Sequence, residues 1–169
     1  MPKKINDLLN PKQLDFMLYD DNRINLLSGS VRSGKTYISL LKFAVFVGSM
    51  PEDSEFLMTG KTVTSLDRNC LGLLQTLVGD NFTYSKNQKS GTLFGRRIWL
   101  EGASDERAES KIRGMTLAGA YIDELTQIPE SFYGERAGAF RLRRMEGTPV
   151  QKRRGWIGTA HRAAWAYFA

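Results

Sequence analysis

The chain has 169 residues, of which 41% are hydrophobic and 11% aromatic, enough for one domain with a sizeable core and too apolar for a disordered protein. Its single cysteine, Cys70, excludes a disulfide framework or a Cys-rich metal site, fits a reducing cytoplasmic compartment and is expected to pack in the core. No stretch reaches the roughly 18 apolar residues of a membrane span, and no apolar run follows the basic N-terminus. We therefore expect a protein that is neither secreted nor embedded in a membrane.

The net charge of +6 comes entirely from the C-terminal part of the chain. Residues 1–134 contain 16 basic and 16 acidic side chains, whereas residues 135–169 contain 8 basic and 2 acidic ones. Seven of those eight are Arg, interleaved with Gly and Ala and lacking apolar periodicity. The sequence therefore predicts a core of residues 1–134 and an atypical basic tail of residues 135–169.

Turn residues and apolar periodicity predict alternating helices and strands. In chain order we expect a short helix over 13–19, a strand over 24–27, a helix over 37–47, a strand over 55–59, a helix over 64–78, a β-hairpin of 82–85 and 97–100 around a turn containing Gly91, a short exposed helix over 104–112, and a buried strand over 118–122. Alternation of this kind favours a parallel sheet, which binds ligands at the carboxyl ends of its strands.

The segment Gly29–Thr36 fits the pattern G-x-x-x-x-G-K-[ST], between a predicted strand and a predicted helix. Such a loop wraps an anion with backbone N–H groups at a helix N-terminus. We expect Lys35 to reach the β and γ phosphates of a nucleotide and Thr36 to ligate Mg²⁺. The predicted nucleotide-contacting residues are Gly29, Ser30, Val31, Arg32, Ser33, Gly34, Lys35 and Thr36. The alternative is a Gly-rich turn that matches by chance.

Two acidic residues, Asp123 and Glu124, directly follow the predicted buried strand. Phosphoryl transfer requires a carboxylate near the metal ion. We expect Asp123 to hold the Mg²⁺ bound to Thr36 through water, and Glu124 to act as the general base on the attacking water. The alternative is a solvated acidic turn.

Four features together resemble the ATPase half of a phage terminase large subunit, over about residues 10–133. They are Asn10-Pro11-Lys12-Gln13, an Arg inside the phosphate loop (Arg32), Lys111-Ile112-Arg113-Gly114, and the stretch Tyr121-Ile122-Asp123-Glu124-Leu125-Thr126-Gln127-Ile128-Pro129. The resemblance implies an α/β P-loop NTPase fold of the RecA/ASCE type, with a mainly parallel sheet flanked by helices. We expect this sheet to be incomplete at the C-terminus.

The resemblance also suggests roles for three further side chains. Gln13 falls at the adenine-recognising position, where its amide offers a donor and an acceptor. Arg32 would stabilise transition-state charge within its own subunit, and Arg113 would reach the nucleotide of the neighbouring subunit. The alternatives are a solvent-exposed Gln13, an Arg32 paired with a surface carboxylate, and an Arg113 at the end of an exposed charged helix.

Terminases of this type use ATP and Mg²⁺ to move double-stranded DNA in the host cytoplasm. They act as a homo-oligomeric ring on the portal protein, together with a small terminase subunit. The resemblance therefore implies an ATP-hydrolysing motor of viral DNA packaging, here truncated and without the family's nuclease domain. Where the family has a Thr-Asn-Pro coupling motif, the chain reads Trp156-Ile157-Gly158-Thr159-Ala160-His161-Arg162. We interpret the tail as the product of an altered reading frame, with a divergent terminus as the alternative.

Other functions share the same motifs. A helicase-like translocase carries both the loop and the acidic pair, but needs a second RecA-like domain for which this chain has no room. A different class is a nucleotide-binding remnant or assembly protein without turnover. We expect nucleotide binding to be weak and hydrolysis to be poor.

Overall fold

The computed structural model describes residues 9–19, 24–30, 32–104, 112, 115–128, 141–142 and 155–160. Its helices are α1 (Pro11–Tyr19), α2 (Lys35–Gly48), α3 (Val63–Leu66) and α4 (Gly72–Val78), with a π-helical segment η2 (Asp67–Leu71) and the 3-10 turns η3 (Gly79–Asn81) and η4 (Leu125–Gln127). Its strands are β1 (Ile24–Ser28), β2 (Glu55–Gly60), β3 (Phe82–Ser85), β4 (Ser90–Leu93), β5 (Arg96–Gly102), β6 (Thr116–Leu117), β7 (Gly119–Ile122), β8 (Arg141–Leu142) and β9 (Gly155–Ala160).

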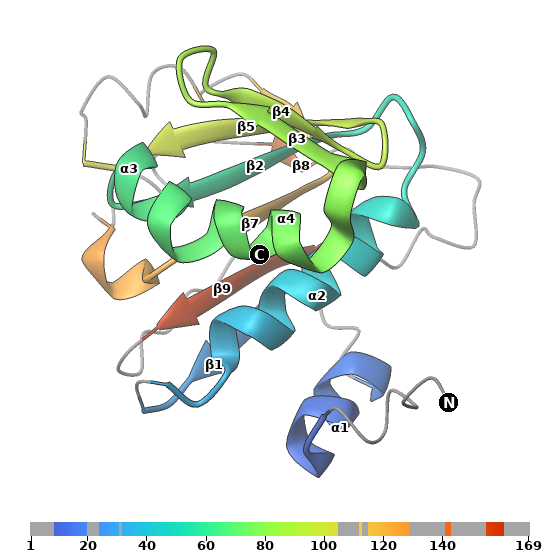
Figure 1. Ribbon diagram of the computed structural model, residues 1–169, viewed down its shortest axis with the longest axis vertical. Coiled ribbons are helices and arrows are strands. Elements are labelled where there is room, and N and C mark those ends of the chain that lie inside the picture. The colour runs from blue at the N-terminus through green and yellow to red at the C-terminus, as the bar shows by residue number, and fades with distance from the viewer. Residues whose placement is uncertain are drawn as a thin grey trace.

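Seven of these strands form one sheet in the order β1-β9-β7-β2-β5-β4-β3. The first five are mutually parallel, and β4 and β3 extend the sheet as an antiparallel edge, while β6 and β8 pair separately. Figure 1 shows α2 and the α3–α4 run crossing one face of this sheet, with α1 beside α2. The predicted fold, a mainly parallel α/β sheet flanked by helices, is confirmed.

Alternate residues of the central strands point into two hydrophobic clusters on opposite faces of the sheet. In β2, Phe56 and Met58 join the cluster under α2 and α4, whereas Leu57 joins the cluster on the other face. The larger cluster also contains Phe43 of α2 and Cys70 of η2, so the cysteine packs in the core as predicted. Burial on both faces is what the near-continuous apolar runs of parallel strands provide.

The segment predicted as a simple hairpin is folded differently. Residues 90–93, which include the expected turn at Gly91, form β4, which pairs with β3 on one side and β5 on the other. β5 is then parallel to β2, so it belongs to the main sheet. The prediction of a hairpin between 82–85 and 97–100 was therefore wrong, because the polar stretch between them contains a strand of its own.

The helix predicted over 64–78 is present but not uniform. α3 and α4 are joined without a break by the π-helical η2, and a capping box begins the run: Thr62 Oγ1 accepts from Ser65 N–H at 3.0 Å, and Ser65 Oγ accepts from Thr62 N–H at 3.1 Å. A capping box satisfies backbone donors that a helix N-terminus leaves unpaired. The helix predicted over 104–112 lies outside the described residues except for its two ends.

Strand β9 lies in the middle of the sheet, although it falls in the part of the sequence assigned to the basic tail. It pairs in parallel with β1 on one side and with β7 on the other. The division of the chain at residues 134 and 135 remains a prediction, and residues 155–160 pair with strands of the first unit. In the described ranges, no helix has the length and apolar character needed to span a membrane.

Candidate functional site

The loop after β1 has the backbone shape that its glycines allow. Gly34 adopts the left-handed conformation (φ 79°, ψ 11°) at the N-cap of α2, which glycine occupies without steric cost. Arg32 also has positive φ, 62°, which is uncommon for a residue with a Cβ atom. The strand, loop and helix predicted from the sequence are therefore contiguous here, and the loop lies at the carboxyl end of β1 (Figure 1).

The ammonium group of Lys35 is held over this loop by the loop itself. Its Nζ donates to the backbone oxygens of Gly29, at 3.0 Å, and Ser30, and to Ser33 Oγ at 3.0 Å. A lysine ammonium has three donors, so all three are engaged. The positive charge is thus fixed inside the loop, in the place where an anion bound by the loop's N–H groups would sit.

Helix α1 brings Gln13 against the same loop. The Gln13 side-chain oxygen accepts from Asn10 N–H, and Asn10 Oδ1 accepts from Gln13 N–H, both at 3.0 Å. This reciprocal pair caps α1 and fixes the Gln13 amide. A Cβ atom added to Gly34 would lie 2.9 Å from Gln13 Nε2, so the amide nitrogen packs directly on the loop. The structure therefore brings Gln13 and the loop together.

The acidic pair lies where β7 ends. Asp123 is only 4% exposed, and its N–H donates to Thr59 O of β2 at 2.8 Å. Its Oδ2 accepts from Asn69 Nδ2 of η2 at 3.0 Å. A buried carboxylate is costly without such donors. Sequence reasoning missed Asn69, since nothing in the local pattern signals a partner 54 residues away.

Glu124 follows in a left-handed backbone conformation, with φ 50° and ψ 53°. Its carboxylate accepts from Gln127 Nε2, and its backbone oxygen accepts from Gln127 N–H at 2.8 Å. Positive φ in a non-glycine residue costs free energy and clusters at functional sites. Among the described residues only four non-glycine residues have it, and two of them, Arg32 and Glu124, are predicted site residues.

The strand register sets the loop and the acidic pair at the same edge. Leu26 of β1 and Ile122 of β7 both pair with Gly158 of β9, so the three strands are level there. Neighbouring strands lie about 4.8 Å apart, so Leu26 and Ile122 are separated by about 10 Å at this level. β1 continues beyond it to Ser28.

A buried chain of hydrogen bonds also joins the two halves. Tyr121 OH lies 3.0 Å from Ser39 Oγ, which donates to Thr36 O at 3.2 Å. Cys70 Sγ lies 4.0 Å from the Tyr121 oxygen. Burial raises the pKa of both Tyr121 and Cys70 well above the usual values, and the Asp123 charge adds to the rise at each. Both groups therefore stay protonated.

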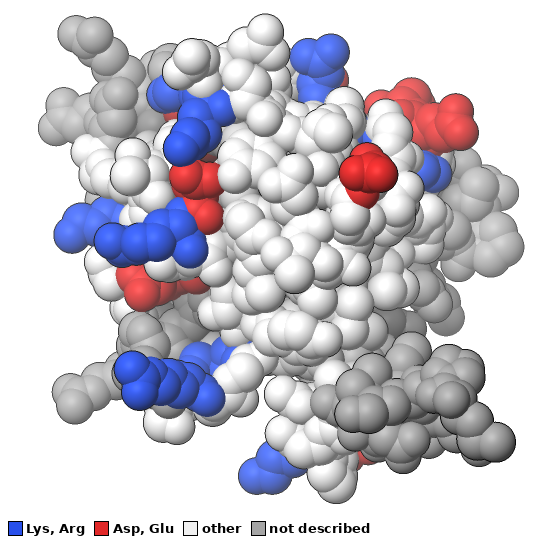
Figure 2. All heavy atoms as spheres, viewed as in Figure 1, with Lys and Arg blue, Asp and Glu red and all other residues white. Residues whose placement is uncertain are grey.

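The basic side chains on one face of the molecule gather along one side. Figure 2 shows Lys and Arg, with acidic groups between them, on the side to which the arrowheads of β2, β5 and β9 point in Figure 1. The area over α2 and α4 is almost free of charge in the same view. Most of the Lys and Arg side chains visible on this face thus lie toward the carboxyl ends of the parallel strands, and further Asp and Glu side chains lie at the opposite upper edge of the view.

The donors available at the carboxyl ends of the parallel strands suit Mg²⁺. Thr36 offers a hydroxyl in the first turn of α2, and Asp123 a buried carboxylate, and hard oxygen ligands are what this cation prefers. The structure brings together Gln13, Gly29, Ser30, Arg32, Ser33, Gly34, Lys35 and Thr36 on the loop side and Asp123 and Glu124 on the acidic side. The remaining predicted site residues, Val31 and Arg113, lie outside the described residues.

Comparison with solved structures finds phage large terminases. A large terminase from a thermophilic bacteriophage matches with a TM-score of 0.68 and 24% identity over 88% of this chain, and the same protein also matches in its complexes with ATP-gamma-S and with ADP. The ATPase domain of the Thermus phage P74-26 large terminase matches with a TM-score of 0.57 and 14% identity over 98% of this chain. The HK97 bacteriophage large terminase matches with a TM-score of 0.61 and 16% identity over 97%.

These matches concern the fold. The chain spans 38% of the first of these terminases, 34% of the HK97 chain and 67% of the P74-26 ATPase-domain chain. No family model and no curated protein matches the sequence. The match to a separately solved ATPase domain, over nearly the whole of this chain, identifies the part of a terminase that the fold corresponds to. The chain has the P-loop NTPase fold of the ATPase domain of phage large terminases.

Proposed function

We propose that this chain is the ATP-binding and ATP-hydrolysing motor domain of a viral DNA-packaging terminase large subunit. The observation that carries the proposal is the ammonium of Lys35, held by Gly29, Ser30 and Ser33 inside a loop that caps a helix. That arrangement offers a fixed positive charge and backbone N–H groups to a polyphosphate. Asp123 and Glu124, at the end of β7, supply the carboxylates for a metal ion and for the attacking water, which a phosphate-binding loop alone lacks.

In hydrolysis each residue has a separate task. Lys35 and Arg32 neutralise charge on the transferred phosphoryl group, whose transition state is loose and anionic. Thr36 and Asp123 would hold Mg²⁺, which would supply further charge neutralisation at the phosphates. Glu124 takes a proton from the attacking water as it bonds to the γ phosphorus, and ADP leaves. The strained backbone of Glu124 supports this role, because strain persists where geometry is functionally constrained.

Two assignments concern recognition and assembly. Gln13 reads the adenine edge with the amide that packs on Gly34. Arg113 serves as the charge stabiliser offered to a neighbouring subunit, in a homo-oligomeric ring that acts on double-stranded DNA with a portal protein and a small terminase subunit in the host cytoplasm. Contacts to DNA phosphates would make DNA-stimulated turnover fall steeply with salt.

Release of phosphate from ATP tests the proposal, with Lys35→Ala and Glu124→Gln as variants and Gln75→Ala, an exposed change in α4, as the control. Lys35→Ala should lose nucleotide binding, measured with a fluorescent ATP analogue. Glu124→Gln should keep binding and lose about 10² to 10⁴ in turnover. A wild-type chain that binds no nucleotide would contradict the proposal. Binding without turnover would favour the non-catalytic alternative.

A further inference from the structure

The hydrogen bond between Asn69 and Asp123 joins the helical run that covers the sheet to the end of strand β7. Asn69 lies in η2, on the helical run that covers the sheet, and its Nδ2 donates to Oδ2 of Asp123 at 3.0 Å. Because Asp123 is 4% exposed, water cannot readily replace this donor. The contact therefore fixes the direction of a carboxylate for which we have proposed a metal-binding role.

Asn69 lies in the π-helical segment η2, which joins α3 to α4. A π turn inserts an extra residue into a helix, and such bulges are frequent at functional sites. In η2 the two residues after Asn69, Cys70 and Leu71, are both fully buried. With Cys70 and Leu71 in the core, Asn69 is left at the margin, facing the end of β7.

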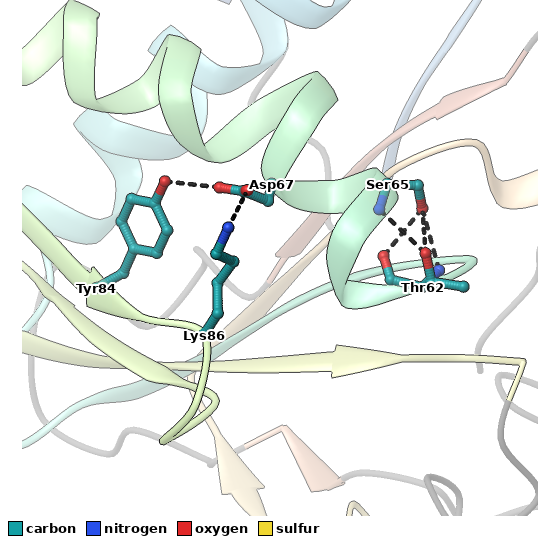
Figure 3. Close-up of polar contacts among 5 residues, drawn as sticks. All are labelled: Thr62, Ser65, Asp67, Tyr84 and Lys86. Carbon is teal, nitrogen blue, oxygen red and sulfur yellow. Dashed lines mark hydrogen bonds and ion pairs between the residues drawn. The ribbon is translucent and has the colours of Figure 1, made fainter.

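The segment that carries Asn69 is anchored at its first residue. Asp67 accepts from Tyr84 OH at 2.6 Å and from Lys86 Nζ at 2.8 Å, as Figure 3 shows. One turn earlier the capping box of Thr62 and Ser65 fixes the start of the helical run (Figure 3). The position of Asn69 is thus supported by two sets of contacts earlier in the same helical run, one of them from the antiparallel edge of the sheet.

We propose that Asn69 is a positioning residue that orients Asp123 for Mg²⁺ in the nucleotide complex. The proposal rests on the proposed ATPase function. Asn69 touches neither nucleotide nor cation in this role, and it acts by holding one carboxylate oxygen of Asp123. Partners that orient a metal ligand in this way typically matter by about 10- to 100-fold in metal affinity or activity.

The test is a Mg²⁺ titration of the binding of a fluorescent ATP analogue by the whole chain. Asn69→Ala should raise the half-saturating Mg²⁺ concentration by about 10-fold and lower kcat, while binding in EDTA stays at the wild-type level, because the Lys35 loop is untouched. Asn69→Asp has the same volume but sets a second carboxylate beside Asp123. Asn69→Asp should raise the half-saturating Mg²⁺ concentration at least as much as Asn69→Ala does. A role of Asn69 in packing alone would not produce this rise, because the Asn and Asp side chains have the same volume.

The control is Gln75→Ala, an exposed substitution on the same helical run that should leave all these readouts unchanged. If Asn69→Ala unfolds the chain, the isosteric Asn69→Asp decides the question alone. Wild-type Mg²⁺ dependence in Asn69→Asp, or tighter Mg²⁺ binding, would overturn the positioning role while leaving the proposed function intact. A wild-type chain that binds no nucleotide would overturn both.

Discussion

The hydroxyl groups of Ser39 and Tyr121 lie 3.0 Å apart in the interior, where both side chains are fully buried. Ser39 is one turn past Thr36 in α2, and Tyr121 is two residues before Asp123, so the contact links the two halves of the candidate site. Either hydroxyl can donate in this contact, and Ser39 Oγ also lies 3.2 Å from Thr36 O. The contact ties the first turn of α2 to the strand that ends at the acidic pair.

Tyr121→Phe should lower the free energy of unfolding by about 1 to 2 kcal/mol, since it removes the phenol hydroxyl and leaves Ser39 Oγ with one partner fewer in the interior. Urea denaturation measures the change. Ser39→Ala is the companion variant and should cost a similar amount, because it takes this hydrogen-bond partner from the buried Tyr121 hydroxyl. Wild-type stability in Tyr121→Phe would show that the contact contributes nothing.

Lys42→Met should loosen α1 and with it the approach of Gln13 to the loop. The Lys42 ammonium donates to Phe16 O of α1 and lies 4.5 Å from the centroid of the Phe16 ring, and Met retains the apolar stem without the charge. Hydrogen exchange of the α1 amides should accelerate several-fold while that of β2 is unchanged. Lys12→Met, at an exposed site on α1, is the control; equal exchange in both variants would contradict the prediction.

The Asp67 contact should make stability depend on acid pH. Hydrogen bonds from Lys86 and Tyr84 lower the pKa of Asp67 from its usual 3.8. Stabilisation is therefore present above that unfolded-state value and is lost as the pH falls through the lowered one. Asp67→Asn should cost about 1 kcal/mol at about pH 7 and progressively less as the pH falls below the usual pKa of 3.8.

The same contact raises the pKa of Tyr84 above its usual 10.0, so it should survive mild alkali. Thermal melts across the pH range, for wild type and Asp67→Asn, measure the acid pH and the alkaline pH at which the stabilisation by the Asp67 contact is lost. A difference between the two proteins that does not shrink as the pH falls below 3.8 would mean that the Asp67 charge is not what the contact uses.

Ile157→Pro should destabilise the chain by at least about 2 kcal/mol, because proline cannot donate in the middle of a sheet. Ile157 pairs with Asn25 of β1 and with Tyr121 of β7. Ile157→Val keeps the amide and a β-branched side chain and should cost about 1 kcal/mol or less. Unchanged stability in Ile157→Pro would mean that residues 155–160 are not part of the sheet, in support of a boundary at 134 and 135.

The elements that carry the nucleotide loop could be predicted from sequence because their signals are local. Gly29, Gly34 and Lys35 have fixed spacing, and the strand before them and the helix after them follow from apolar periodicity and turn residues. The buried strand before Asp123 was predicted on the same grounds. These residues specify structure through their own backbone preferences, so no distant contact is needed to recognise them.

The remainder depends on contacts between residues far apart in the chain. Ser90 to Leu93 read as a polar turn, and only pairing with β3 and β5 makes them a strand. The π-helical register at Asp67 and the contact of Asn69 with Asp123 likewise have no local signature. The excess of arginine predicts a boundary between residues 134 and 135, before β9. Backbone pairing of β9 with β1 and β7 depends instead on strand register and neighbours.

The position of β9 also orders events during synthesis. Among the described strands β1 pairs only with β9, so within this part of the structure the strand that leads into the phosphate loop gains its sheet partner when residues 155–160 have left the ribosome. β2, β5, β4 and β3 pair with one another within residues 55–102, and from beyond residue 102 this half receives β7, which pairs with the other side of β2. We expect a nascent chain to form the part of the sheet made of β2, β3, β4 and β5 first. It should acquire affinity for nucleotide only when β9 inserts beside β1, so that nucleotide binding appears late in folding.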